Sequence, residues 1–325
     1  MQSGHGSIGR RGLMAGAAAG LALPARAQEA WPNRPVKVII PFPAGGASDF
    51  IARLWGDKLQ GFFGQPFVLD NRGGASGTIG VESVIRSAPD GHTLLQTPNS
   101  PITVVPQLRK VNYDARKDLL PIARVGDMVA GFVIVASLGI NTMAELVAYA
   151  KKKPGKLSYG SAGLGTATHM RIEMLKTRAG IDILHVPYRG SAEALNDVLA
   201  GNIQMMNEII ALPHVRSGKL KLLAVNYPTR HPDYPDVPTL TEAGFPNADV
   251  PIWYSLQAPA GTPRDIITRL NAKIVETAQT DDMIRRMREI NIVVPVQTPE
   301  EIAIYRDADM EANAKLVREA NIRLD

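Results

Sequence analysis

Two glycine-rich segments are the parts of this sequence best suited to binding chemistry. They are Pro43-Ala44-Gly45-Gly46-Ala47-Ser48-Asp49 and Gly160-Ser161-Ala162-Gly163-Leu164-Gly165-Thr166, each between a predicted strand and a predicted helix. Small residues let a ligand approach the backbone, and the first turn of a helix offers free N–H groups and the positive end of its dipole. The two segments could therefore hold opposite sides of one anion. Alternatively, their glycines serve turn geometry alone.

No catalytic or metal-binding group can be assembled from the sequence around these segments. There is no cysteine, which excludes thiolate ligands, a cysteine nucleophile and disulfides. There is no Gly-x-Ser-x-Gly elbow or Walker loop, and the histidines lack metal-ligand spacing. Gly163-Leu164-Gly165 with Asp182 imitates a dinucleotide fingerprint, but Thr168 stands at the third glycine position. His169, about one turn into the second helix, could face a ligand or pack. We expect no catalytic residue, no metal and no cofactor.

The elements that must position the two segments follow an α/β pattern. Val36 to Ile40 is a run typical of a buried strand, and Ser48 or Asp49 can cap the helix after it. A second series begins at Phe132 and includes a helix opened by the capping box Thr142-Met-Ala-Glu145. Short apolar strands alternating with amphipathic helices predict parallel sheets, whose ligands bind beyond the carboxyl ends of the strands. Helices close the C-terminal third.

The first 27 residues have the features of an export signal. Arg10-Arg11 precede an apolar stretch, residues 12–23, that is too short to cross a bilayer, and Ala25-Arg26-Ala27 fits a signal-peptidase site. The paired arginines favour the twin-arginine route over an ordinary Sec signal. We therefore expect cleavage after Ala27 and a mature periplasmic protein that is not embedded in the membrane.

Length and charge narrow the function further. The 325 residues are about twice the usual length of one domain, and 45% of them are apolar, enough for a substantial core. The formal charge is +5, but without Arg10, Arg11 and Arg26 the chain has 33 basic against 31 acidic residues. Such a balance gives no reason to expect nucleic acid as a partner.

Several longer motifs occur in order along the chain after residue 30. They are Trp31-Pro32-x-Arg34-Pro35-Val36, Pro41-Phe42-Pro43-Ala44-Gly45-Gly46-x-x-Asp49, Asn71-Arg72-Gly73-Gly74-Ala75-Ser76-Gly77, Pro89-Asp90-Gly91-His92-Thr93, Tyr159-Gly160-Ser161-Ala162-Gly163-x-Gly165-Thr166-x-x-His169 and His185-Val186-Pro187-Tyr188-Arg189-Gly190. In sequence and order they resemble the Bug family, the solute-binding proteins of tripartite tricarboxylate transporters. The resemblance spans essentially the whole mature chain.

The resemblance implies a type II-like periplasmic-binding-protein fold. Two lobes, each a mostly parallel sheet flanked by helices, would enclose a ligand cleft. After the signal peptide at 1–27, the first lobe would comprise residues 28–128 and 251–325, and the second lobe residues 129–250. The family's ligands are small carboxylates, including di- and tricarboxylates, acidic amino acids and aromatic acids. Lobe closure would capture the ligand, and membrane permease subunits would receive it from a receptor that we expect to be a monomer.

The resemblance also identifies the residues expected at the ligand site. The two glycine-rich loops would hold a carboxylate largely through backbone N–H groups and waters, with Asp49 ordering its loop rather than touching the anion. The expected ligand-binding residues are Phe42, Pro43, Ala44, Gly45, Gly46, Ser48, Asp49, Asn99, Ser161, Ala162, Gly163, Thr166, His169 and Glu208.

One cleft segment departs from the family pattern. Residues 202–208 belong to a stretch about two residues shorter than in many relatives, where the family selects the distal part of the ligand. The alignment in this segment leaves open whether Asn207 or Glu208 points into the cleft. If Glu208 pointed inward, it would favour a ligand with a cationic or hydrogen-donating tail, such as an amino acid. Otherwise Glu208 is a solvent-facing loop residue.

Two other functions fit the same scaffold. One is a periplasmic enzyme, such as an isomerase or hydrolase that uses His169 and Asp49. The other is a sensor subunit that reports its ligand to a membrane kinase.

Overall fold

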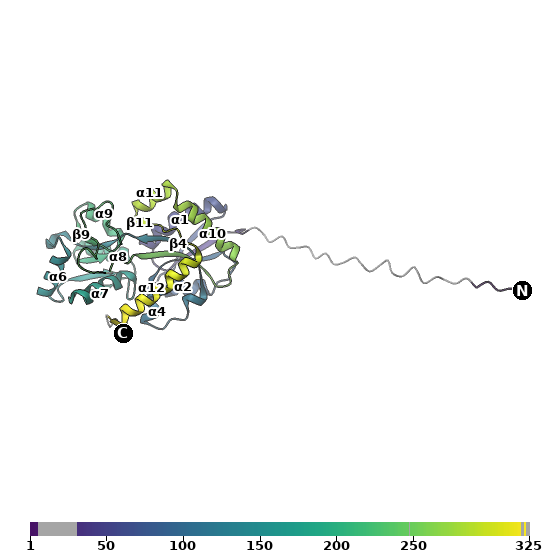
Figure 1. Cartoon of the computed structure of the whole chain (residues 1–325), viewed down its shortest axis with the longest axis horizontal. Coiled ribbons are helices and arrows are strands. Elements are labelled where there is room, and N and C mark those ends of the chain that lie inside the picture. The colour runs from purple at the N-terminus through teal and green to yellow at the C-terminus, as the bar shows by residue number, and fades with distance from the viewer. Residues whose placement is uncertain (6–30, 247, 320–321, 323–325) are drawn as a thin grey trace.

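The computed structural model describes residues 1–5, 31–246, 248–319 and 322. The proposed signal sequence from residue 6 onward and its cleavage site after Ala27 lie outside the described residues. Within the described ranges, no helix combines the length and the apolar composition needed to cross a membrane. Figure 1 shows two lobes side by side, one built from the beginning and end of the chain and the other from its middle. This confirms the predicted two-lobe α/β architecture.

The first lobe is built on a six-stranded sheet with the order β11-β4-β10-β3-β1-β2. Its strands are β1 (Val36–Ile40), β2 (Phe67–Asn71), β3 (Thr93–Pro98), β4 (Leu119–Met128), β10 (Ile252–Pro259) and β11 (Ile292–Val293). Its helices are α1 (Ala47–Phe63), the 3₁₀ turn η1 (Ala75–Gly77), α2 (Thr78–Ile85), α3 (Ser100–Thr103), α4 (Val105–Leu108), α5 (Ala115–Asp118), α10 (Arg264–Ala278), α11 (Asp281–Glu289) and α12 (Pro299–Glu319).

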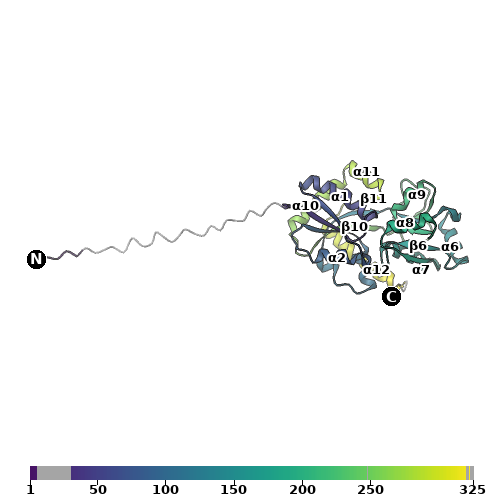
Figure 2. The ribbon, with the colours of Figure 1, turned by 180° about the vertical axis from the view of Figure 1, so that it is seen from behind.

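The second lobe is built on a five-stranded sheet with the order β7-β6-β8-β5-β9. Its strands are β5 (Gly131–Val135), β6 (Ser158–Ser161), β7 (Leu184–Pro187), β8 (Met205–Asn207) and β9 (Leu220–Val225). Its helical segments are η2 (Ala136–Leu138), α6 (Met143–Lys152), α7 (Ala167–Ala179), α8 (Ser191–Ala200), η3 (Ile209–Ala211) and α9 (Leu212–Arg216). The view from behind in Figure 2 shows the two lobes again as separate bodies, with α12 of the first lobe extending toward the second.

The strand directions differ in part from the predicted mostly parallel sheets. In the first sheet β1 pairs in parallel with β2 and β3, but β10 runs antiparallel to both β3 and β4. In the second sheet β6 is parallel to β7 and β8, whereas β5 is antiparallel to β8 and β9. The first sheet is mixed because β4 leads out of the lobe and β10 leads back into it. Met128 and Ile252 are paired at this crossing.

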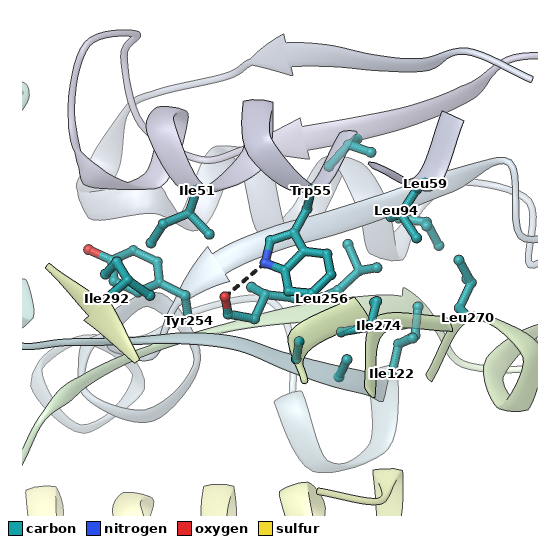
Figure 3. Packing of buried hydrophobic residues seen from close by; sticks show 14 of the residues in the cluster. Ile51, Trp55, Leu59, Leu94, Ile122, Tyr254, Leu256, Leu270, Ile274 and Ile292 are labelled. Atoms are coloured by element: carbon teal, nitrogen blue, oxygen red, sulfur yellow. Dashed lines mark hydrogen bonds between the residues drawn. The ribbon is translucent and has the colours of Figure 1, made fainter. Parts of the chain in front are cut away.

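Helix α1 packs its apolar face against the sheet of the first lobe and contributes to the core there. Ile51, Trp55 and Leu59 recur every four residues, so they lie on one face of the helix, and all are buried. The indole Nε1 of Trp55 donates to the carbonyl of Val125 at 2.9 Å. Figure 3 marks the hydrogen bond of the Trp55 indole with a dashed line. The pairing of β4 and β10 shifts register at this point, which leaves Val125 opposite no partner in the ladder. The contact therefore holds α1 in a fixed position on the sheet.

Helix α12 connects the two lobes at a second place. Asp309 accepts hydrogen bonds from Thr103 at 2.7 Å and from the Trp253 indole at 3.1 Å, both in the first lobe. Near the end of the helix, Leu316 packs against the core of the second lobe. The lobes are thus joined by the crossings at β4 and β10 and by the last helix.

Candidate ligand cleft

A small cavity lies between the lobes, at the N-termini of α1 and α7. Its volume is about 40 Å³, and it is lined by both lobes. The lining residues are Phe42, Pro43, Gly46, Ala47, Ser48, Pro98, Ser100, Ile252 and Tyr254 from the first lobe and Ala162, Thr166, Ala167, Thr168, Gly190, Ser191 and Glu208 from the second. This volume suits a head group of a few atoms rather than a large ligand.

Free backbone N–H groups from both lobes meet at this cavity. The first two residues of α1 are Ala47 and Ser48, and those of α7 are Ala167 and Thr168; all four line the cavity. Within the described residues, none of these four N–H groups donates a hydrogen bond to another backbone group. Donors of this kind have no partner inside their own helix, and both helix dipoles add positive potential. The arrangement suits an anion held from two sides.

The cavity itself has no basic side chain. Among the described residues that line it, none is Lys, Arg or His. The described ranges also contain no group of three or more His, Asp or Glu side chains arranged for a metal ion. Any positive potential inside therefore comes from backbone N–H groups and helix ends.

A larger opening of about 870 Å³ adjoins the cavity through Phe42, Pro43 and Ala162, which line both. Two arginines, Arg109 and Arg189, line this opening. Anions approaching the cleft would thus meet basic side chains first and backbone donors afterwards.

Asp49 orders the first glycine-rich loop from behind. Its Oδ2 accepts the N–H of Gly45 at 3.2 Å, and its carboxylate pairs with Arg53 on the next turn of α1 at 2.9 Å. Gly45 has a φ of 84°, a left-handed conformation that favours glycine. Asp49 is only 2% exposed and does not line the cavity. Its carboxylate thus orders the loop from outside the cavity wall.

His169 has the corresponding role in the second loop. Its Nδ1 accepts the N–H of Gly165 at 3.1 Å, and its ring stacks on His185 with 4.1 Å between ring centroids. Burial lowers the pKa of His169 to about 4 and that of His185 to about 3. Both rings are therefore neutral at pH 7, as acceptance by Nδ1 requires. His185 Nε2 in turn lies 2.7 Å from the hydroxyl of Ser161, which is itself 1% exposed.

Glu208 is buried at the wall of the cavity. It is 4% exposed, and its Oε1 accepts the hydroxyl of Ser191, while Oε2 has no hydrogen-bond partner in the described part of the chain. Burial raises the pKa of Glu208 to about 7, although Ser191 and the N–H of Ile209 act in the opposite direction. The alternative of a solvent-facing Glu208 is therefore wrong.

The structure separates the expected site residues into two groups. Phe42, Pro43, Gly46, Ser48, Ala162, Thr166 and Glu208 line the small cavity, and Gly163 lines the adjoining opening. Ala44, Gly45, Asp49, Asn99, Ser161 and His169 line neither of these spaces. Asn99 was expected in the cleft, but its amide donates to Asp309 on α12 at 3.0 Å. Its neighbour Ser100 lines the cavity instead.

Several lining residues were missed from the sequence. Ala167 and Thr168 directly follow the predicted loop, so extending that loop by one helical turn would have found them. Ser191 opens a third helix at the cavity, and the preceding Gly190 ends a motif already noted. Tyr254 carries no local signal, because its position depends on the return of β10 between β3 and β4.

Comparison with protein families and curated relatives gives matches over most of the chain. The model of the tripartite tricarboxylate transporter family receptor matches residues 51–321. Protein BugT of Bordetella pertussis is 34% identical over 312 residues, which are 95% of this chain and 95% of that protein.

Solved structures match most of this chain. R. palustris Rpa4515 with adipate has 31% identity and a TM-score of 0.87, covering 90% of this chain and 99% of that one. The periplasmic binding protein BugD has 31% identity and a TM-score of 0.85, with coverage of 90% and 99%.

Proposed function

This chain belongs to the tripartite tricarboxylate transporter receptor family, and from that membership we propose that it captures a small carboxylate in the cleft between its lobes. The protein is a solute-binding receptor. The observation that carries the proposed ligand class is the meeting of four free N–H groups, those of Ala47, Ser48, Ala167 and Thr168, at one small cavity. A relative of the same fold is known with adipate, a dicarboxylate.

The proposed capture is reversible closure of the lobes. A carboxylate that accepts from α1 and α7 together makes contacts that exist only when the lobes are close. Such a ligand stabilises the closed form by its differential affinity for that form. The charges on the ligand need no basic side chain in the cavity, because desolvated N–H donors hold anions well.

We propose that the protein is exported to the periplasm and delivers its ligand to a membrane permease. The family and fold are those of periplasmic binding proteins. Cleavage after Ala27 and use of the twin-arginine route follow from the sequence pattern Arg10-Arg11 and Ala25-Arg26-Ala27. The closed receptor would dock on membrane permease subunits and release its ligand there. A monomer would suffice, since both sides of the cleft come from one chain.

We also propose that the protein catalyses no reaction on its ligand. An enzyme on this scaffold would use Asp49 and His169, but both are engaged in ordering loops and neither lines the cavity. Ligand recovered chemically unchanged after prolonged incubation would support this; a converted ligand would contradict it.

The ligand class is tested by comparing acids with their amides. Protein recovered from the periplasm after expression of the full chain is screened by thermal shift and calorimetry with mono- and dicarboxylates, including adipate and succinate, and with their amides. We expect at least one acid to raise the melting temperature and its amide to have no effect. The carboxylate site would be contradicted if acid and amide raised the melting temperature equally, or if no acid had any effect on it.

A further inference from the structure

Glu208 presents an acceptor that the rest of the protein leaves unused. Its Oε1 is occupied by Ser191, but Oε2 is buried with no hydrogen-bond partner among the described residues. A buried polar atom without a partner is costly, so each such atom in a native protein calls for an explanation, such as a bound water, ion or ligand. Glu208 lines the same cavity as the four free N–H groups of α1 and α7. The cavity thus contains one acidic side chain beside an array of donors.

The hydrogen bond that Glu208 already makes indicates its role. Burial raises the pKa of this carboxylate, while the Ser191 hydroxyl, which donates to Oε1, and the nearby backbone N–H of Ile209 lower it and so favour the ionised form. A group arranged in this way is built to accept hydrogen bonds. The remaining oxygen therefore fits a donor on the ligand, and it repels a second carboxylate.

Resting on the carboxylate-binding function proposed above, we propose that Glu208 makes this receptor selective for a small carboxylate that carries an amine close to its acid group. The ligand's carboxylate accepts from the helix N-termini, and its ammonium group donates to Oε2 of Glu208. The two ligand charges thereby meet opposite protein charges inside one cavity.

The size of the cavity limits the spacing between the two ligand groups. Donors and acceptor line one space of about 40 Å³. We therefore expect the amine to lie close to the carboxylate, as in α- and β-amino acids. The remainder of the ligand extends into the adjoining opening through Phe42, Pro43 and Ala162.

The pH dependence of binding follows from the same geometry. Burial raises the pKa of Glu208 to about 7, so the free receptor is only partly ionised at neutral pH. Among the described residues that line the cavity, Tyr254 is the other titratable group; burial and the charge of Glu208 raise its pKa, so it stays neutral. An ammonium ligand binds the ionised form of Glu208. Its affinity should therefore rise about tenfold between pH 6 and pH 8.

The test compares matched ligands in two variants. Calorimetry measures L-alanine and β-alanine against propionate, and L-aspartate against succinate, in the wild type and in Glu208→Gln. Gln preserves the shape but removes the charge. Glu193→Gln is the control, because Glu193 is an exposed acid on α8 whose contact with the Arg189 N–H an amide oxygen can retain.

We expect at least one amino acid to bind tenfold or more tightly than its unaminated counterpart. Glu208→Gln should abolish that preference and its pH dependence, while Glu193→Gln retains both. If succinate and propionate bind to the wild type with the same affinity as the amino acids, the proposed role of Glu208 is wrong. The proposal of a carboxylate receptor would then still hold. Failure of every acid, aminated or not, would overturn both proposals.

Discussion

The hydroxyl of Ser76 in the first lobe donates to the carbonyl of Leu164 in the second lobe at 2.6 Å. This hydrogen bond spans the mouth of the cleft and joins the loop before α2 to the second glycine-rich loop. Ser76 adopts a left-handed backbone, with a φ of 56°, to make it. The contact can form only when the lobes are close, so it belongs to the closed form.

Removing this hydroxyl should weaken ligand binding without unfolding the protein. In Ser76→Ala one hydrogen bond of about 1 kcal/mol is lost from the closed form alone, which corresponds to roughly fivefold weaker affinity. Calorimetry with the best carboxylate measures the loss. Ser83→Ala removes a hydroxyl that donates to the Gly80 carbonyl within the same helix, and it should leave the affinity unchanged. Equal affinities for Ser76→Ala and the wild type would show that the contact does not contribute to closure.

Asp49 should affect affinity although it does not line the cavity. Asp49→Ala removes the acceptor for the Gly45 N–H and the partner of Arg53, so the first loop loses its fixed conformation. We expect at least tenfold weaker carboxylate binding, measured by calorimetry. Asp57→Ala, an exposed acid on the same helix, is the matched control. An unchanged affinity in Asp49→Ala would mean that the loop holds its shape without this carboxylate.

Burial of the neutral His169 ring should contribute stability that is lost as the pH falls below about 6.5. Because burial lowers the pKa of His169 to about 4, the unfolded chain binds a proton between these values that the folded protein does not. The free energy of unfolding should thus be roughly 2 kcal/mol smaller at pH 5 than at pH 7.5 from this histidine. His185 acts in the same direction.

Urea unfolding of the wild type and His169→Gln at the two pH values isolates this contribution. The variant should lose roughly 2 kcal/mol less than the wild type on acidification. Both proteins contain Asp127 and Glu208, whose raised pKa values act in the opposite direction. Their contribution cancels when the change in unfolding free energy between the two pH values is compared for the wild type and the variant. If the unfolding free energies of the two proteins change equally with pH, His169 does not make this contribution.

Trp55→Phe should lower the stability of the protein without changing its affinity for a carboxylate. It leaves the buried Val125 carbonyl without its donor and shortens a core side chain, so we expect a loss of about 2–3 kcal/mol in unfolding free energy. Phe62→Leu, at a half-exposed position of the same helix, should change stability by about 0.5 kcal/mol or less. Carboxylate affinity should stay at the wild-type value in both. A large affinity loss in Trp55→Phe would show that α1 shifts on its sheet.

Local sequence patterns correctly predicted the features that depend on residues close together in the chain. The strand at Val36–Ile40 is confirmed, and the helix opened by Thr142 is confirmed with the side chain of Thr142 accepting the Glu145 N–H. Both rest on residues a few positions apart. The cavity residues next to the two glycine-rich loops were identified for the same reason.

Contacts between distant segments could not be predicted in this way. Asn99 turns to Asp309, which is 210 positions away on a helix whose placement no local pattern reveals. The mixed first sheet depends on β10 returning after the second lobe has been completed. For Glu208 the sequence left both orientations open, because the shortened segment could not be placed against the family with certainty. Its direction follows from the packing of β8 and α8, through Ser191.

The position of β10 has a consequence for the order in which the chain can fold during synthesis. The five strands of the second sheet lie within residues 131–225, so that lobe can form while the ribosome is still adding the C-terminal quarter. The first sheet must wait, because β10 is the strand that joins β3 to β4. The N-terminal segment therefore emerges first but is completed last, and until residue 259 has been released its exposed strand edges would be accessible to chaperones.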